Sequence, residues 1–284
     1  TGGDLSGGSS TASSGVATFG SIALAKHAAG FELRFTAANM AADVDSNAFT
    51  VNGVLAITTQ PVTTVAGATM SAVVLEIRNN AGVKLTSADT ATTAAITTDG
   101  HLGSTASVLT GGSATATSGD LSYAGIAINR NGPGFKLTFS GIALLPVETD
   151  AFVIQGKLLI QTQPSTTVAG AAMASVVVQV VDNSNAVIDS AVDVVTATIQ
   201  AQPHSGAVVS GGSATATSGV ATFGSISLDQ NGAGFVLQFA ASDMVASVLG
   251  SSFDSTGTLS ITAQPQVLGG SNAVMTLETI TVEI

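Results

Sequence analysis

The sequence predicts an all-β protein built from tandem β-sandwich repeats, on three observations. A Gly-Gly-Ser block begins at residues 7, 111 and 211, so it recurs after 104 and then 100 residues. A Gln-Pro pair begins at residues 60, 163 and 264, so it recurs after 103 and then 101 residues. Apolar side chains also alternate with polar ones inside each copy. Two independent markers therefore give one period close to 102 residues, and the alternation indicates strands.

One alternating segment is present in all three copies. In the first copy Phe31, Leu33 and Phe35 alternate with Glu32 and Arg34. Residues two apart point to the same face of a strand, so these apolar side chains are expected in a core. The matching residues of the later copies are Phe135, Leu137, Phe139, Phe235, Leu237 and Phe239. A second segment with constant spacing is expected to form the next strand: Phe49, Gly53, Leu55 and Ile57, then Phe152, Gly156, Leu158 and Ile160, then Phe253, Gly257, Leu259 and Ile261.

Turn-forming residues separate the strand-like segments. Asn79-Asn80-Ala81-Gly82 and Asp182-Asn183-Ser184-Asn185 are of this kind. About seven short strands per repeat, without an amphipathic helix, are typical of an immunoglobulin-like sandwich. The chain has no Cys and no Trp, so it lacks the disulfide and core Trp of antibody domains, and only the architecture is predicted. Because no flexible linker separates the repeats, we expect them to form a rod.

The repeat resembles a known group of domains. The segment Leu-Ala-Ile-Thr-Thr-Gln-Pro-Val-Thr-Thr-Val-Ala-Gly from Leu55 to Gly67, followed by Ser118-Gly119 and by Gly134 to Phe139, carries the resemblance. It is similar to the tandem bacterial immunoglobulin-like repeats of large surface and secreted fibre or adhesin proteins. The resemblance covers nearly the whole chain. It implies an extracellular or cell-surface location and a non-enzymatic role.

The repeat positions divide the chain into four parts. Residues 1–57 match only the later strands of a repeat, residues 58–160 and 161–262 are complete repeats, and residues 263–284 match only the first strands of a further one. The missing start and the surplus end are complementary, so residues 263–284 are candidate donor strands for the next subunit. The alternative is that a longer covalent array was cut at arbitrary points. A counterpart of residues 79–104 is missing from both ends.

The two incomplete ends define a hypothetical polymerisation interface. An N-terminal half-sandwich would leave apolar side chains uncovered and a sheet edge unpaired. These side chains are Phe19, Phe31, Leu33, Phe35 and Phe49. A partly apolar face of the C-terminal strand needs a partner, and its residues are Val274, Thr276, Ile280, Val282 and Ile284. Strand addition between copies would then produce a head-to-tail filament.

Six repeated residues are expected to shape the backbone. Gly15, Gly119 and Gly219 each end a segment of small residues and are predicted to permit a turn. Proline has no amide donor, so it suits a strand edge or a place where a strand changes sheets. These prolines are Pro61, Pro164 and Pro265.

Residues with catalytic or metal-binding chemistry form no cluster along the sequence. His101 and His204 lie in equivalent loops, but neither has a second ligand at metal-binding spacing, and the two Asp/Asn segments at residues 43–45 and 182–185 lack the full calcium-loop pattern. The 7 Lys and Arg residues against 18 Asp and Glu argue against nucleic acid, and no apolar run reaches the length of a membrane span. We therefore expect no enzyme activity, no cofactor, no metal site, no nucleic-acid partner and no membrane insertion.

The favoured function is a structural subunit or segment of an extracellular fibre. Its partners would be copies of itself, joined head to tail, with lateral association as a further option. The alternative is an adhesin stalk or binding module whose sandwich loops recognise a surface glycan or a protein. That alternative predicts a repeat with an aromatic or strongly charged loop unlike the others.

Overall fold

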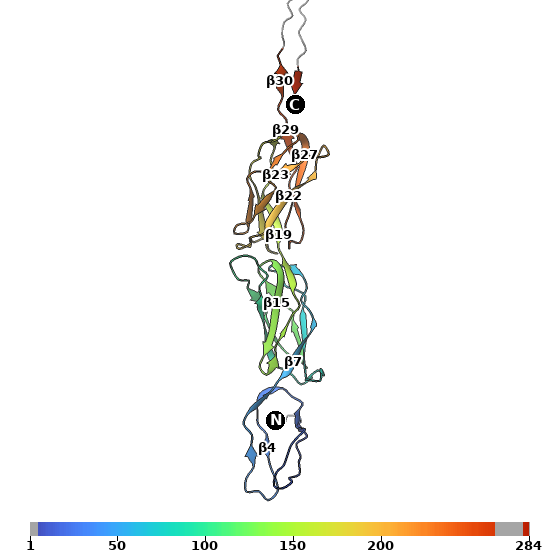
Figure 1. Cartoon of the computed structure of the whole chain (residues 1–284), viewed down its shortest axis with the longest axis vertical. Coiled ribbons are helices and arrows are strands. Elements are labelled where there is room, and N and C mark those ends of the chain that lie inside the picture. The colour runs from blue at the N-terminus through green and yellow to red at the C-terminus, as the bar shows by residue number, and fades with distance from the viewer. Residues whose placement is uncertain (1–4, 265–280, 284) are drawn as a thin grey trace, which may run out of the picture. The chain divides into compact units, whose positions relative to one another are not determined.

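The computed structural model describes residues 5–264 and 281–283. All regular secondary structure in that part of the chain is β-strand, which confirms the predicted all-β class. Its residues include no helix long and apolar enough to cross a membrane. Two compact units divide the chain, Thr1–Gly156 and Lys157–Ile284, and Figure 1 shows their strands.

A complete β-sandwich lies between residues 53 and 155, and we call it the middle sandwich. Its first sheet has the strand order β12-β10-β15-β18-β8, with β17 beside β15, and its second sheet has the order β13-β9-β7-β16. The short pair β11-β14 stands apart. The strands are β7 (Gly53–Thr59), β8 (Thr64–Val65), β9 (Val73–Arg78), β10 (Ala91–Thr98), β11 (Leu109–Thr110), β12 (Ser113–Thr115), β13 (Asp120–Tyr123), β14 (Ala127–Ile128), β15 (Gly132–Gly141), β16 (Leu144–Leu145), β17 (Val147–Glu148) and β18 (Phe152–Gln155).

The core of the middle sandwich lies between its two sheets. Alternate residues of β9 and β15 are fully buried, as the period of two predicts. Tyr123 of the second sheet contacts Phe139 of the first, with ring centroids 4.7 Å apart. The Tyr123 hydroxyl is hydrogen-bonded to the Thr92 hydroxyl of β10 at 2.5 Å.

A second complete sandwich repeats this arrangement between residues 157 and 256. Its first sheet has the order β20-β29-β27-β22-β24 with β28 beside β27, its second has the order β19-β21-β25, and β23 pairs with β26. Phe223 and Phe239 replace the Tyr123–Phe139 pair, at 5.3 Å. The strands are β19 (Lys157–Thr162), β20 (Thr167–Val168), β21 (Val176–Val181), β22 (Val194–Ala201), β23 (Val209–Ser210), β24 (Ser213–Thr215), β25 (Val220–Phe223), β26 (Ser227–Leu228), β27 (Gly232–Ala240), β28 (Val248–Leu249) and β29 (Phe253–Thr256).

Two shorter pieces complete the described part. Residues 5–51, which we call the N-terminal module, contain only the pairs β1-β2, β3-β6 and β4-β5. After β29 the chain forms the C-terminal hairpin, β30 paired with β31. The strands are β1 (Leu5–Ser6), β2 (Ala23–Leu24), β3 (Ala28–Phe31), β4 (Arg34–Phe35), β5 (Val44–Asp45), β6 (Phe49–Val51), β30 (Ser260–Ala263) and β31 (Thr281–Glu283).

The first strand of each sandwich begins before the repeat division that the sequence suggested. The segment from Phe49 to Ile57 was expected to be one strand, but it forms β6 and β7, which belong to different sheets. The strand β7 pairs with β9, so the middle sandwich begins at Gly53 instead of residue 58, and the next unit begins at Lys157 instead of residue 161. The Gln-Pro pair was a misleading start signal, because it follows the first strand. Pro61 and Pro164 are buried where the chain passes from one sheet to the other.

Candidate assembly interface

One edge of the N-terminal module has no neighbouring strand among the described residues. A tight turn with the bridge Ser13–Val16 matches the bridges Thr117–Asp120 and Thr217–Val220 of the two sandwiches. There, the residues after the turn form β13 and β25, which pair with β9 and β21. Residues 17–19 form no strand, since no counterpart of β9 lies beside them in the part that the structure describes.

The aromatic pair of the core is retained in this module but lies in the wall of an open groove. The rings of Phe19 and Phe35 are 5.1 Å apart and tilted by 57°, as in the two sandwiches. Both are only half-buried, whereas Tyr123 and Phe139 are fully buried. A groove of about 510 Å³ opens beside them, lined mainly by apolar atoms of residues that include Ala17, Phe19, Phe35, Met40 and Val44.

A second open edge flanks the same region at Met40. Asn39 and Ala143 share a positive φ, 63° and 52°, so Met40 corresponds to Leu144. In the middle sandwich Leu144 pairs in parallel with Gly53 of β7, and its side chain is 7% exposed. Met40 is 68% exposed. The module therefore lacks, at both edges, the strands that β7 and β9 supply in the middle sandwich.

The predicted apolar residues of the module are less exposed than expected. Phe31 packs on Phe49 at 6.1 Å, as Phe135 packs on Phe152, and Leu33 is half-buried. These side chains cover one another in pairs, so no member of the predicted set is fully exposed. The open surface is formed by Phe19 and Phe35, together with Met40, Val16 and Val44, which the sequence analysis missed.

The C-terminal hairpin has the same register as the first hairpin of each sandwich. Ile261 lies opposite Val282, and the register shifts before Ala263 and Thr281. The pairs Ile57–Leu75 and Ile160–Val178 have the same shift at the same place. Val282 therefore corresponds to Leu75 and Val178, which also pair with β13 and β25.

The apolar face of this hairpin is exposed in the described residues. Leu75 and Val178 are completely buried, while Val282 is 50% exposed. Leu259 is 70% exposed, against 3% for its counterpart Leu55. The remaining predicted residues of this strand, Val274, Thr276, Ile280 and Ile284, lie outside the described part of the chain, as does Pro265.

The three repeated glycines have left-handed backbone conformations. Their φ values are 80° at Gly15, 80° at Gly119 and 77° at Gly219. A Cβ on Gly119 would lie 2.5 Å from the Leu85 carbonyl oxygen, and one on Gly15 would meet nothing within 4 Å. Gly119 therefore adds a close backbone approach to its turn.

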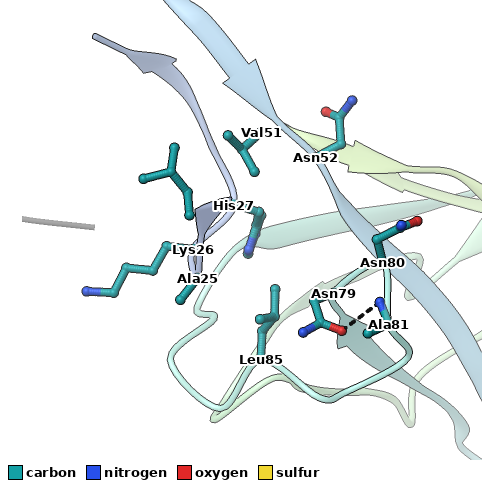
Figure 2. A pocket seen from close by; sticks show the side chains of 10 residues that line it. Ala25, Lys26, His27, Val51, Asn52, Asn79, Asn80, Ala81 and Leu85 are labelled. Atoms are coloured by element: carbon teal, nitrogen blue, oxygen red, sulfur yellow. Dashed lines mark hydrogen bonds between the residues drawn. The ribbon is translucent and has the colours of Figure 1, made fainter. Parts of the chain in front are cut away.

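A pocket of about 330 Å³ lies between the N-terminal module and the middle sandwich (Figure 2). His27 lines it and forms a hydrogen bond between its Nε2 and the Thr90 hydroxyl, at 2.8 Å. Burial lowers the pKa of His27, and the nearby Asp89 opposes this effect. On the other wall the Ala81 amide donates to the Asn79 side chain, which shapes the loop. These contacts tie the two parts together.

Asp99, His101 and Ser107 are the residue types of a catalytic triad, and here the serine is hydrogen-bonded to the carboxylate. The Asp99 carboxylate accepts hydrogen bonds from the Ser107 amide and hydroxyl and from the His101 amide, and these bonds lower its pKa against the opposing effect of burial. The His101 Nδ1 lies 2.9 Å from the Asn131 carbonyl oxygen. The hydrogen bonds of Asp99 close this loop.

Basic side chains contact both Asp/Asn segments that were considered for calcium. Lys157 Nζ donates to the Asn183 carbonyl oxygen and to the Asn185 side chain, so an ammonium group occupies the oxygen ligands of that loop. Asp45 forms two hydrogen bonds with Arg34. Within the described ranges no three His, Cys, Asp or Glu residues could hold a metal ion together.

Comparisons with known proteins give only distant likenesses. No protein-family model and no curated protein matches the chain. The adhesin InvE of Yersinia pseudotuberculosis is similar at 17% identity and a TM-score of 0.36, over 71% of this chain and 58% of the adhesin chain. A titin I-band fragment is 12% identical with a TM-score of 0.31, over 74% of this chain and 69% of the fragment. A β-glycosidase from Bacteroides vulgatus is 12% identical with a TM-score of 0.25, over 70% of this chain and 25% of the glycosidase. Likenesses this remote do not distinguish an adhesin from an enzyme.

Proposed function

We propose that this chain is a non-catalytic structural subunit of an extracellular fibre, joined head to tail by strand complementation. The C-terminal hairpin of one copy completes the N-terminal module of the next. One observation carries the proposal: the module is open where the middle sandwich holds β7 and β9, and β30 and β31 pair in the register of those two strands.

Burial of apolar surface drives the contact. Leu259, Ile261 and Val282 are between 50% and 70% exposed on the hairpin, and Met40 is 68% exposed on the module. Burying one such side chain contributes about 1.5–3 kcal/mol, and strand pairing satisfies the open backbone edges. The donor and acceptor surfaces lie on different parts of the chain, so the contact is heterologous and continues from copy to copy.

Among the described residues the module has no counterpart of four strands of the middle sandwich, β7, β8, β9 and β10, and the hairpin supplies counterparts of β7 and β9. In the middle sandwich β10 lies between β12 and β15. The described strands of the hairpin, β30 and β31, include no counterpart of β10, so the position between residues 9–11 and β4 stays open in this docking. A completed N-terminal module is therefore less fully closed than the middle sandwich.

An extracellular location agrees with the resemblance to surface and secreted repeats and with the composition. Charged residues make up 9% of the chain, so few like charges oppose contact between subunits, and 7 Lys and Arg residues offer trypsin few cleavage sites. The adhesin alternative gains no specific support. An apolar segment at residues 143–147 could be considered as a contact loop, but Leu144 is buried in its own sandwich.

Electron microscopy and sedimentation of the purified chain test the proposal. We expect filaments whose length increases with protein concentration. A chain truncated after Ala263 and the variant Val282→Asp should both remain monomeric. The matched control is Thr281→Asp, which introduces the same charge on the adjacent, opposite-facing residue and should interfere less.

Two outcomes contradict the proposal. A full chain that stays monomeric at high concentration has no complementing hairpin, and the module then takes its strands from elsewhere, as in a longer covalent array. Equal polymerisation of the truncated chain assigns the contact to another surface.

A further inference from the structure

We infer that docking has one register, which is set by Gly257 of one copy against Met40 of the next. This inference rests on the proposed head-to-tail function and specifies its geometry. It places β31 antiparallel to residues 16–18, with Val282 opposite Ala17. It places the start of the β30 segment parallel to residues 40–41.

The antiparallel side follows from matched pairs in both sandwiches. Leu75 lies opposite Ile57 on one side and opposite Leu121 on the other. Val178 lies opposite Ile160 and Ala221 in the same way. Val282 already lies opposite Ile261, so its other edge is open for the counterpart of Leu121 and Ala221. The turn bridges identify that counterpart as Ala17.

The parallel side follows from the close approach at Gly53. The Gly53 amide donates to the Ala143 carbonyl oxygen at 2.9 Å, and Gly53 pairs with Leu144. A Cβ on Gly53 would lie 2.9 Å from the Leu144 Cδ2 and 3.1 Å from the Ile77 Cγ2. Because Gly53 has no positive φ, the restriction is space and not backbone conformation.

Gly257 has the position in the hairpin segment that Gly53 has in the middle sandwich. Each glycine lies four residues before the isoleucine that starts the matched pairing, Ile57 or Ile261. Gly257 is exposed in the described chain, so a side chain there should leave the folded subunit intact. In the docked state Met40 replaces Leu144, so a side chain at position 257 would crowd the side chain of Met40.

The test is the assembly of full-length variants, measured by sedimentation. Gly257→Val should raise the concentration needed for assembly at least ten-fold without changing the melting curve of the monomer. The matched control is Ser260→Val, because its counterpart Leu159 is a large side chain that is 41% exposed on an outward face. Met40→Ala combined with Gly257→Ala should assemble better than Gly257→Ala alone, since the smaller side chain at position 40 makes room.

Engineered cysteines give an independent reading of the register, because the chain has none of its own. Two chains carrying Ala17→Cys and Val282→Cys should be joined by a short thiol cross-linker, whereas Val16→Cys with Val282→Cys should not, since neighbouring residues face opposite sides. If Val282→Asp blocks filaments but Gly257→Val does not, or if the Val16 pair links more readily, the register is wrong while strand complementation stands. If the unmodified chain never assembles, the proposed function itself is wrong.

Discussion

Leu144 of the middle sandwich and Met40 of the N-terminal module follow the same left-handed residue, yet their side chains are 7% and 68% exposed. The difference between the two regions is the presence of β7 and β9 beside one and not beside the other. Turns and aromatic pairs form in both, at nearly equal ring distances of 4.7 and 5.1 Å. Local sequence is therefore sufficient for the turn and the ring contact, while burial depends on strands from elsewhere in the chain or from another copy.

The largest expected effect comes from removing the same aromatic ring in the two regions. Phe139→Ala should destabilise the middle sandwich by about 3–5 kcal/mol, because a fully buried ring leaves a cavity. Denaturation can be followed by the fluorescence of Tyr123, the only tyrosine in a chain without tryptophan. Phe35→Ala should lower the free energy of unfolding of the monomer much less, since that ring is half-buried. Equal losses would mean that the N-terminal module is closed in the monomer.

The second effect compares glycines at the same turn. Gly119→Val should destabilise the middle sandwich by about 1–3 kcal/mol, through its positive φ and the close approach to Leu85. Gly15→Val has the same φ but no close neighbour, so its cost should be smaller. Thermal unfolding of both variants measures the difference, and an unchanged melting curve for Gly119→Val would remove the close approach as an explanation.

The regular part of this architecture was predictable from local patterns. Alternation at residues 31–35, 135–139 and 235–239 identified strands and their buried faces, because a strand with one buried face has a period of two. The segment from Phe49 to Ile57, which was expected to be one strand, is divided at Asn52 into two strands of different sheets, although Asn52-Gly53 is a turn-forming pair. Such a change of sheet is decided by pairing with distant strands.

The interface was predictable only in part for a similar reason. Repeated aromatic positions pointed to Phe19 and Phe35, but Met40 is a single apolar residue after a loop, so periodicity gives no signal. Aligning it with Leu144 and Met244 of the later copies would have found it, since both of those side chains are buried. The exposed face of the hairpin could be inferred from alternation, but its register is a property of backbone pairing.

Hydrogen exchange in assembled filaments should separate the two open positions of the module. The amides of residues 16–18 should become protected, because β31 of another copy lies opposite them. The amide hydrogens of residues 9–11 should still exchange fast. Their counterpart β12 pairs only with β10, and β30 and β31 supply no counterpart of β10. Protection of residues 9–11 would indicate a further strand in the filament.

The smallest effect concerns Tyr123 of the middle sandwich. The other two repeats have phenylalanine at this core position, Phe19 and Phe223. Burial raises the pKa of the Tyr123 phenol, and the hydrogen bond with Thr92 opposes this. The unfolded chain loses the phenolic proton near pH 10, while the folded chain keeps it to higher pH. The free energy of unfolding should therefore fall as the pH rises above about 10.

Tyr123→Phe should remove this alkaline loss of stability. It should also lower the free energy of unfolding by about 0.5–1.5 kcal/mol at neutral pH, because the hydrogen bond with Thr92 is lost. Circular dichroism of both proteins between pH 7 and pH 11 measures the difference, in which the titration of all other groups cancels. Parallel curves over that range would mean that water reaches the phenol in the folded state, and the closed core that distinguishes the middle sandwich from the N-terminal module would then need revision.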